Sequence, residues 1–105
     1  MKNSENINLT LNDMKVLSSL LDKQMYGLEI IEYLSEKSNT KIVLGSLYNV
    51  LARLERNGLV ESKWGDSVAE RGGNRRRYYN ITGLGEKVIE DAQFQFSSLW
   101  NLQLV

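Results

Sequence analysis

The sequence contains no cysteine, no histidine and no proline among its 105 residues. Without cysteine and histidine, the chain has no disulfide, no thiol nucleophile, no imidazole acid–base group and no Cys/His zinc site. We therefore expect a protein that is not an enzyme and that carries no metal and no cofactor. Without proline, the helix boundaries have to be inferred from capping residues and glycines.

Long apolar stretches are also missing. The longest uninterrupted aliphatic run is Ile42-Val43-Leu44, far shorter than the roughly 20 apolar residues of a membrane-spanning helix. The opening segment, MKNSENINLT, is polar and lacks the apolar segment of a signal peptide. We therefore expect a cytoplasmic protein with no membrane partner, and the length allows a single compact unit.

The formal net charge is zero, but the charges are unevenly distributed. Residues 41–80 carry eight basic and four acidic side chains, and all six arginines lie in this segment. A local basic patch is typical of a phosphate-binding surface, because in physiological salt a charge acts over only about 8–10 Å. From charge alone, a solvated face with scattered ion pairs is an equally good explanation.

Apolar spacing predicts three helices in the first half of the chain. A capping signal at Thr10 and Asp13 starts a helix over 11–21. After a turn over 22–26, a second helix begins at Gly27 and ends at the turn over 38–40. The third helix, over 44–57, ends at a glycine suited to a C-terminal cap and carries a leucine stripe at helical spacing: Leu44, Leu47, Leu51 and Leu54.

The second half of the chain predicts a β-hairpin and a final helix. Strands are expected over 59–64 and 75–81, around the glycine-rich tip GDSVAERGGN, and Thr82 caps a helix that runs to about residue 102. This order of elements is that of a winged helix-turn-helix: a mainly α fold with a small two-stranded β wing and one appended helix. We divide the chain into a winged helix-turn-helix DNA-binding domain over 1–82 and a C-terminal dimerisation helix over 83–105.

The outer face of the third helix has the composition of a major-groove reader. Gly45 and Ala52 would allow close approach to DNA, while Asn49 and Arg53 suit adenine and guanine edges. An exposed polar helix face with no ligand explains this pattern nearly as well. Three further side chains on this helix are candidate phosphate contacts: Ser46, Tyr48 and Arg56.

The hairpin favours DNA binding over a merely solvated basic surface. Arg75, Arg76 and Arg77 lie at the base of its tip, with Arg71 and Lys63 nearby. Alternate strand residues face opposite sides, so Arg75 and Arg77 should share one side and Arg76 the other. Guanidinium groups suit phosphates and narrow minor grooves. The alternative is a charged edge that prevents aggregation.

The last helix carries an apolar stripe at spacings of three and four. Its far half has no partner within so small a chain, so we expect a homodimer interface that would place two reading helices on palindromic half-sites. Aromatic positions at helical spacing are more often interface core, but Phe96 and Trp100 are also candidates for binding a small aromatic effector. The expected interface residues are Ile89, Ala92, Phe96, Leu99 and Trp100.

Three segments together resemble the PadR family of bacterial winged-helix regulators: YGLEIIEYL, LGSLYNVLARLERNGLVESKWGD and RRRYYNITGLGEKVIEDA. The resemblance covers about residues 11–92 and is carried by the S-L-Y helix start, the RLE-x-x-GL-V turn and the R-x-YY-x-IT strand. It implies DNA contacts by the third-helix residues Ser46, Tyr48, Asn49 and Arg53 and by the wing arginines at 75–77.

The length of the chain resembles the family's short-tailed subgroup, whose members dimerise through the last helix. Some members of that subgroup repress multidrug exporter genes and bind planar drugs between aromatic side chains at the dimer centre. The resemblance places Phe96 near the ligand-stacking aromatic. Leu44 and Gly83 stand where the family usually has proline, and because both prolines start helices, we expect lower local rigidity there rather than lost function.

We therefore expect a sequence-specific transcriptional regulator that binds double-stranded DNA. In full, the hypothesis is a dimeric repressor of its own or neighbouring genes that binds a palindromic operator. A small planar effector that relieves the repression is a further part of this hypothesis. Two alternatives are a structural DNA binder, such as a plasmid segregation or nucleoid protein, and a protein-interaction adaptor that has lost DNA binding.

Overall fold

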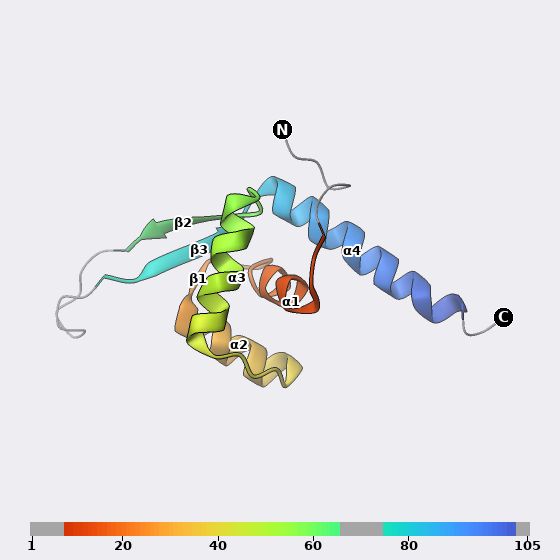
Figure 1. Cartoon of the computed structure of the whole chain (residues 1–105), viewed down its shortest axis with the longest axis horizontal. Coiled ribbons are helices and arrows are strands. Elements are labelled where there is room, and N and C mark those ends of the chain that lie inside the picture. The colour runs from red at the N-terminus through yellow and green to blue at the C-terminus, as the bar shows by residue number, and fades with distance from the viewer. Residues whose placement is uncertain (1–7, 66–74, 103–105) are drawn as a thin grey trace.

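The structure, a computed structural model, describes residues 8–65 and 75–102. Three helices form a body from which a β wing projects on one side and a long helix on the other (Figure 1). The described elements are α1 (Leu11–Ser19), β1 (Met25–Tyr26), α2 (Gly27–Ser38), α3 (Leu44–Arg56), β2 (Val60–Trp64), β3 (Arg77–Ile81) and α4 (Gly83–Leu102). This is the mainly α fold with a β wing that the sequence predicts.

The start of α1 is the capping box that the sequence predicts. The Thr10 hydroxyl accepts a hydrogen bond from the Asp13 N–H, and Asp13 Oδ2 accepts one from the Thr10 N–H, each at 3.0 Å. The helix ends at Ser19, two residues before the predicted end. Its last turn is tightened because Leu20 and Leu21 donate to carbonyls only three residues back.

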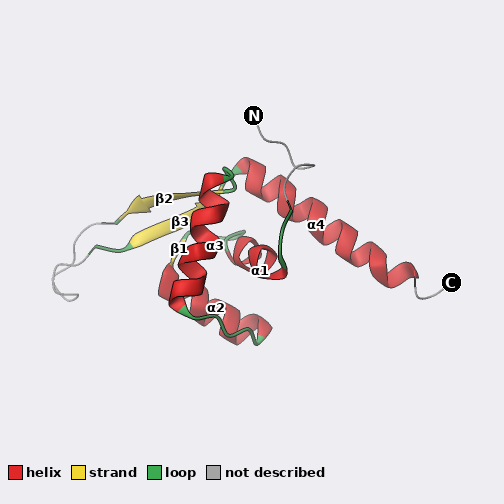
Figure 2. Cartoon of the chain, viewed as in Figure 1, coloured by secondary structure: helices red, strands yellow, loops and turns green. Residues whose placement is uncertain are grey.

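The sheet contains one strand more than predicted (Figure 2). Its order is β1-β3-β2 and all pairs are antiparallel, with Met25 opposite Tyr79 and Trp64 opposite Arg77. The two residues of β1 lie where the sequence predicted only a turn, since a strand this short shows no alternation. The wing itself is two-stranded as expected, although β3 begins at Arg77 and leaves Arg75 and Arg76 before the ladder.

The core is formed by apolar side chains from all four helices and the sheet. Leu47, Leu51 and Leu54 are buried as predicted, whereas Leu44, the first residue of the expected stripe, is 38% exposed. It lies at the start of α3, where its side chain lies near Gly27 of α2 and lines a surface groove. The helix α4 completes the core with Val88 and Ile89, which are almost fully buried.

The junction between the wing and α4 is closely packed. The Thr82 hydroxyl caps α4 by accepting from the Gly85 N–H at 3.0 Å and donates to the Gly58 carbonyl at 2.7 Å. Gly58 has a φ of +76°, as expected for a glycine that ends a helix. A Cβ atom at position 85 would lie 2.1 Å from the Leu59 carbonyl oxygen, so this approach requires glycine.

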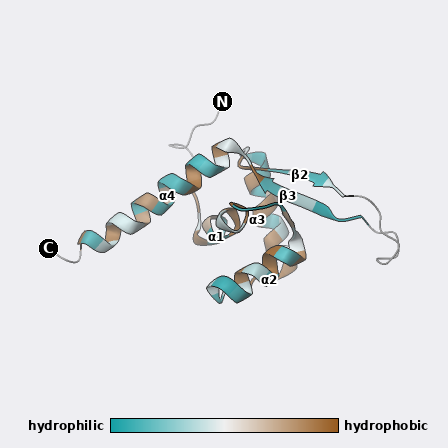
Figure 3. Ribbon diagram, turned by 180° about the vertical axis from the view of Figure 1, so that it is seen from behind, coloured by the Kyte–Doolittle hydropathy of each residue, from teal (hydrophilic) through white to brown (hydrophobic). Residues whose placement is uncertain are grey.

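Beyond its second turn, α4 leaves the body, and apolar residues continue along it to its free end (Figure 3). Phe96, Leu99, Trp100 and Leu102 are exposed there. Among the described helices, none combines the length and the hydropathy needed to cross a membrane.

We expect Gly85→Ala to lower the free energy of unfolding by about 3 kcal/mol, at the upper end of overpacking penalties, because the added methyl collides with backbone. Gly83→Ala is the matched control, since a Cβ there meets no atom within 4 Å, and it should be neutral or slightly stabilising. Urea unfolding followed by circular dichroism measures both. Equal midpoints for the two variants would contradict the packing described for Gly85.

Candidate nucleic-acid interface

One face of α3 is exposed along its whole length. Ser46, Asn49 and Arg56 point away from the core, and a Cβ at Gly45 would meet no atom within 4 Å. The exposed face therefore carries the small and polar residues that the sequence singled out, because the leucines opposite them are buried.

Tyr48 lies on the flank of this face and is 43% exposed. Its hydroxyl packs against Gly27 at the start of α2, where a Cβ would come within 2.8 Å of the oxygen. The tyrosine therefore packs against the start of α2, where the glycine leaves room for its hydroxyl.

Arg53 has a structural role that the sequence analysis missed. Its guanidinium donates to Oδ1 of Asp13 in α1, a carboxylate that is only 1% exposed. The other oxygen of Asp13 accepts the Thr10 N–H. The ion pair joins α3 to α1 and occupies part of the guanidinium, so fewer of its N–H groups are available for the base contact that the sequence predicts. The capping signal explained Asp13 fully, and nothing in the pattern pointed to a second partner.

The wing arginines are held by aromatic rings. Arg75 lies 5.8 Å and Arg77 5.6 Å from the centroid of the Trp64 ring, and Arg76 lies 4.1 Å from that of Tyr26. Arg75 and Arg77 therefore share an aromatic partner that Arg76 does not. All three arginines nevertheless line one groove, so Arg76 is not separated from the other two as strand alternation predicts. Lys63 is exposed opposite Tyr78, and Arg71 lies outside the described residues.

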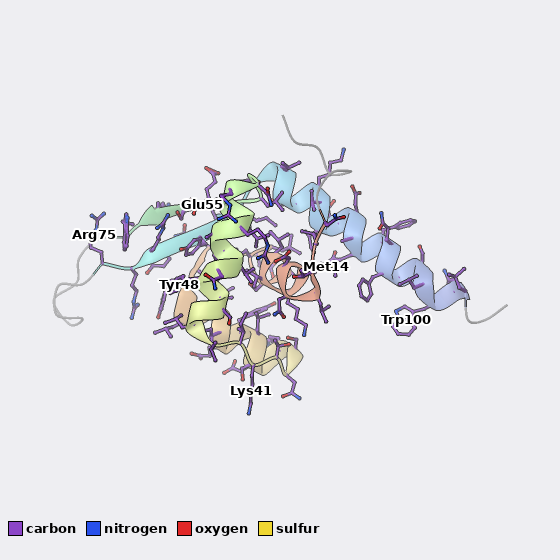
Figure 4. All side chains as sticks on the ribbon, viewed as in Figure 1. Met14, Lys41, Tyr48, Glu55, Arg75 and Trp100 are labelled. Carbon is purple, nitrogen blue, oxygen red and sulfur yellow. The ribbon has the colours of Figure 1, made fainter. Side chains whose placement is uncertain are left out.

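A groove of about 540 Å³ separates α3 from the wing. Its walls carry both acidic and basic groups, since Glu55 from α3 faces Arg77 from β3 at 3.4 Å. Figure 4 shows Tyr48 and Glu55 along α3, with Arg75 toward the end of the wing. The lining residues are Tyr26, Leu28, Leu44, Tyr48, Ala52, Glu55, Trp64, Arg75, Arg76, Arg77 and Tyr79.

Tyr79 forms a buried part of this groove and is 5% exposed. Burial raises the pKa of its hydroxyl above 10.0, the nearby Tyr48 and Glu55 act in the same direction, and the Arg77 cation opposes them. The hydroxyl therefore stays protonated and able to donate a hydrogen bond throughout the neutral range.

Trp64, Glu55 and Tyr79 were not among the predicted site residues. The register of the hairpin places Trp64 and Tyr79 on the side of the wing that faces α3. Alternation along the predicted strand 59–64 was a signal that could have found Trp64.

The expected interface residues on α4 fall into two groups. Ile89 is 1% exposed and belongs to the core of the protomer, because α4 packs on α1 at that point. It therefore offers no surface to a second subunit. Ala92 is partly buried, while Phe96, Leu99 and Trp100 are exposed, the last by 62%. Phe94 and Leu102, which the sequence analysis did not include, are exposed by 74% and 70%.

Two grooves flank α4 where it leaves the body, and Met14 of α1, Ala92 and Phe96 contribute to both. One has a volume of about 760 Å³ and reaches Leu99, and the other, of about 370 Å³, reaches Tyr33 of α2. Figure 4 shows Met14 on the body side of α4 and Trp100 near its far end.

Comparisons with known proteins identify a family that this chain matches. The model of a family described as the transcriptional regulator PadR-like family matches residues 16–91. An uncharacterized protein of Lysinibacillus sphaericus is 35% identical over 81 residues, which are 75% of this chain and 72% of the relative.

Solved structures give the same result. A PadR-family transcription regulator from hypervirulent Clostridium difficile R20291 matches with a TM-score of 0.76 and 30% identity, over 86% of this chain and 91% of that one. Bacillus subtilis PadR, solved in complex with operator DNA, matches with a TM-score of 0.72 over 80% of this chain and 48% of its own. At 16% identity, this second likeness shows the fold alone.

The ion pair between α1 and α3 leads to a stability prediction. We expect Arg53→Met to lower the free energy of unfolding by about 1–3 kcal/mol, because the buried Asp13 carboxylate loses a charged donor. Arg56→Met, at an exposed position in the same helix, should change it by less than about 0.5 kcal/mol. Urea unfolding of both variants checks this, and a loss no larger than that of the control would show that the pair contributes nothing to stability.

Proposed function

Because this chain belongs to the PadR-like family of transcriptional regulators, and is thus a DNA-binding regulator, we propose that it acts as a dimeric repressor of its own or neighbouring genes. In this proposal it binds a palindromic double-stranded operator and blocks the promoter. The observation that carries the proposal is the exposed polar face of α3, next to a wing whose arginines are held toward the same groove.

Each side chain of the interface has a proposed role in this complex. Asn49 reads a base edge in the major groove, and Arg53 contributes the guanidinium N–H groups that Asp13 leaves available. The remaining residues contact the phosphate backbone and fix the register of the protein on DNA: Ser46, Tyr48, Arg56, Lys63, Arg71, Arg75, Arg76 and Arg77.

The proposed dimer forms through the far half of α4. Phe96, Leu99 and Trp100 are exposed on a helix that extends beyond the body, and a second copy would cover them. The smaller of the two grooves beside α4 offers mainly apolar surface on the body itself for the partner's helix. A planar effector would bind between Phe96 and Trp100 of the two subunits and change the separation of the two reading helices.

Capture of sheared genomic DNA by the purified protein, followed by sequencing, tests the function. We expect a few palindromic peaks near promoters that persist at moderately raised salt, where random fragments are lost. Spreading over many adjacent sites would instead support a structural DNA binder. No enrichment over random fragments would contradict the proposal and leave the protein-interaction adaptor.

We expect Asn49→Ala to weaken operator binding by about 1–3 kcal/mol while leaving binding to random DNA unchanged, because a lost base contact affects only the specific complex. Fluorescence anisotropy with the captured operator and with a scrambled duplex measures this. A matched control is Asn101→Ala at the far end of α4, which should change neither affinity. Equal losses on both duplexes would contradict base reading by Asn49.

We expect Phe96→Asp to convert the dimer into monomers, because it places a charge in the proposed apolar interface. Ser97→Asp adds the same charge about 100° around the helix and should leave the dimer intact. Light scattering at matched concentrations gives the mass of each variant. A dimeric Phe96→Asp protein, or a monomeric wild type, would refute the proposed interface.

A further inference from the structure

The groove between α3 and the wing contains a hydrogen-bonded network that already engages Arg77, one of the proposed phosphate contacts. Ser62 donates its hydroxyl hydrogen to Glu55 Oε2 at 2.7 Å, and Arg77 Nε donates to the Ser62 oxygen at 2.9 Å. A terminal nitrogen of Arg77 then reaches Glu55 Oε1 at 3.4 Å. The Glu55 carboxylate therefore lies within the surface that should face DNA, and it pairs with Arg77, a cation proposed to contact a DNA phosphate.

Tyr79 provides a second observation at the same place. It lines the groove, and only 5% of its surface is exposed to solvent. Within residues 8–65 and 75–102, no hydrogen bond reaches its hydroxyl, although Tyr48 and Glu55 lie close enough to affect its titration. Buried hydroxyls are normally paired, and a ligand in the groove would give this hydroxyl a partner.

We propose that the groove is a phosphate-binding site. In this site a phosphodiester of bound DNA replaces Glu55 as the partner of Arg77 and accepts a hydrogen bond from Tyr79. Glu55 is then an intramolecular competitor that lowers the affinity for every DNA sequence. The inference rests on the proposed function, because it requires that the protein binds DNA through α3 and the wing.

The exchange is favoured by the geometry on both sides. The contact between Arg77 and Glu55 is long and partly exposed, and such pairs are weak. A phosphate offers several charged oxygens, with which a guanidinium can form two parallel bonds. Arg77 also lies 5.6 Å from the Trp64 ring and 5.7 Å from the Tyr79 ring, so these rings keep its guanidinium in the groove when it leaves Glu55.

A double-mutant cycle tests the exchange. Glu55→Gln should tighten binding to a short random duplex by about two- to fivefold, the range expected for an exposed ion pair. In an Arg77→Met background the same change should give no more than the control Glu61→Gln. Glu61 is exposed on the other side of the wing, opposite Asn80, and has the same charge. Anisotropy titrations give all affinities.

A second variant tests the floor of the groove. Tyr79→Phe removes only the hydroxyl, and we expect it to weaken DNA binding about three- to tenfold, as loss of one hydrogen bond would. The unfolding midpoint should stay the same or rise, since the hydroxyl has no partner in the described structure. A merely structural hydroxyl would do the reverse, lowering the midpoint and leaving DNA affinity unchanged.

The outcomes separate this inference from the proposed function. If the wild type binds DNA but Glu55→Gln gives equal gains with and without Arg77, the exchange is wrong while the regulator remains. The same conclusion follows if Glu55→Gln behaves like Glu61→Gln. If the wild type binds neither operator nor random DNA, both the proposed function and the proposed phosphate-binding site are wrong.

Discussion

The orientation of α3 about its own axis determines which residues can face DNA. Burial of Leu47, Leu51 and Leu54 fixes that orientation, and each such side chain contributes about 1.5–3 kcal/mol when removed from water. A rotation of one residue, about 100°, would expose these leucines and bury polar side chains. The polar face is therefore exposed because the opposite face is in the core, and the ion pair between Arg53 and Asp13 holds the same orientation from α1.

The wing depends on α3 in turn. The turn at Gly58 sends β2 back alongside the reading helix, and the approach of Gly85 to Leu59 fixes α4 against that turn. Glu55 of α3 is linked to the wing through Ser62 and Arg77. The reading face, the arginine-bearing wing and the apolar helix are thus positioned by one compact junction, with the wing and α4 on opposite sides of the body (Figure 1).

Local signals were enough to predict the order of the four helices and the hairpin, the cap at Thr10 and the bounds of α2 and α4, because each rests on residues adjacent in sequence. The two-residue strand β1 could not be predicted, since it is a strand only through its pairing with β3, more than 50 residues later. The same applies to the site. Exposure of Ser46 and Asn49 follows from helical spacing, whereas the pairing of Arg53 with Asp13 is a contact across 40 residues. Ile89 was assigned to a subunit interface because spacing alone does not say which half of an apolar stripe meets the body.

The central claim is that α3 and the wing of two subunits contact one palindrome. Hydroxyl-radical and dimethyl-sulfate footprinting on a captured operator tests it most directly. The account predicts two symmetric patches one helical turn apart, about 34–36 Å. Each patch should show major-groove protection by α3 beside backbone protection by the wing, and the backbone protection should be lost in an Arg75→Ala, Arg77→Ala double variant. A single asymmetric patch, or uniform protection along the duplex, would contradict it.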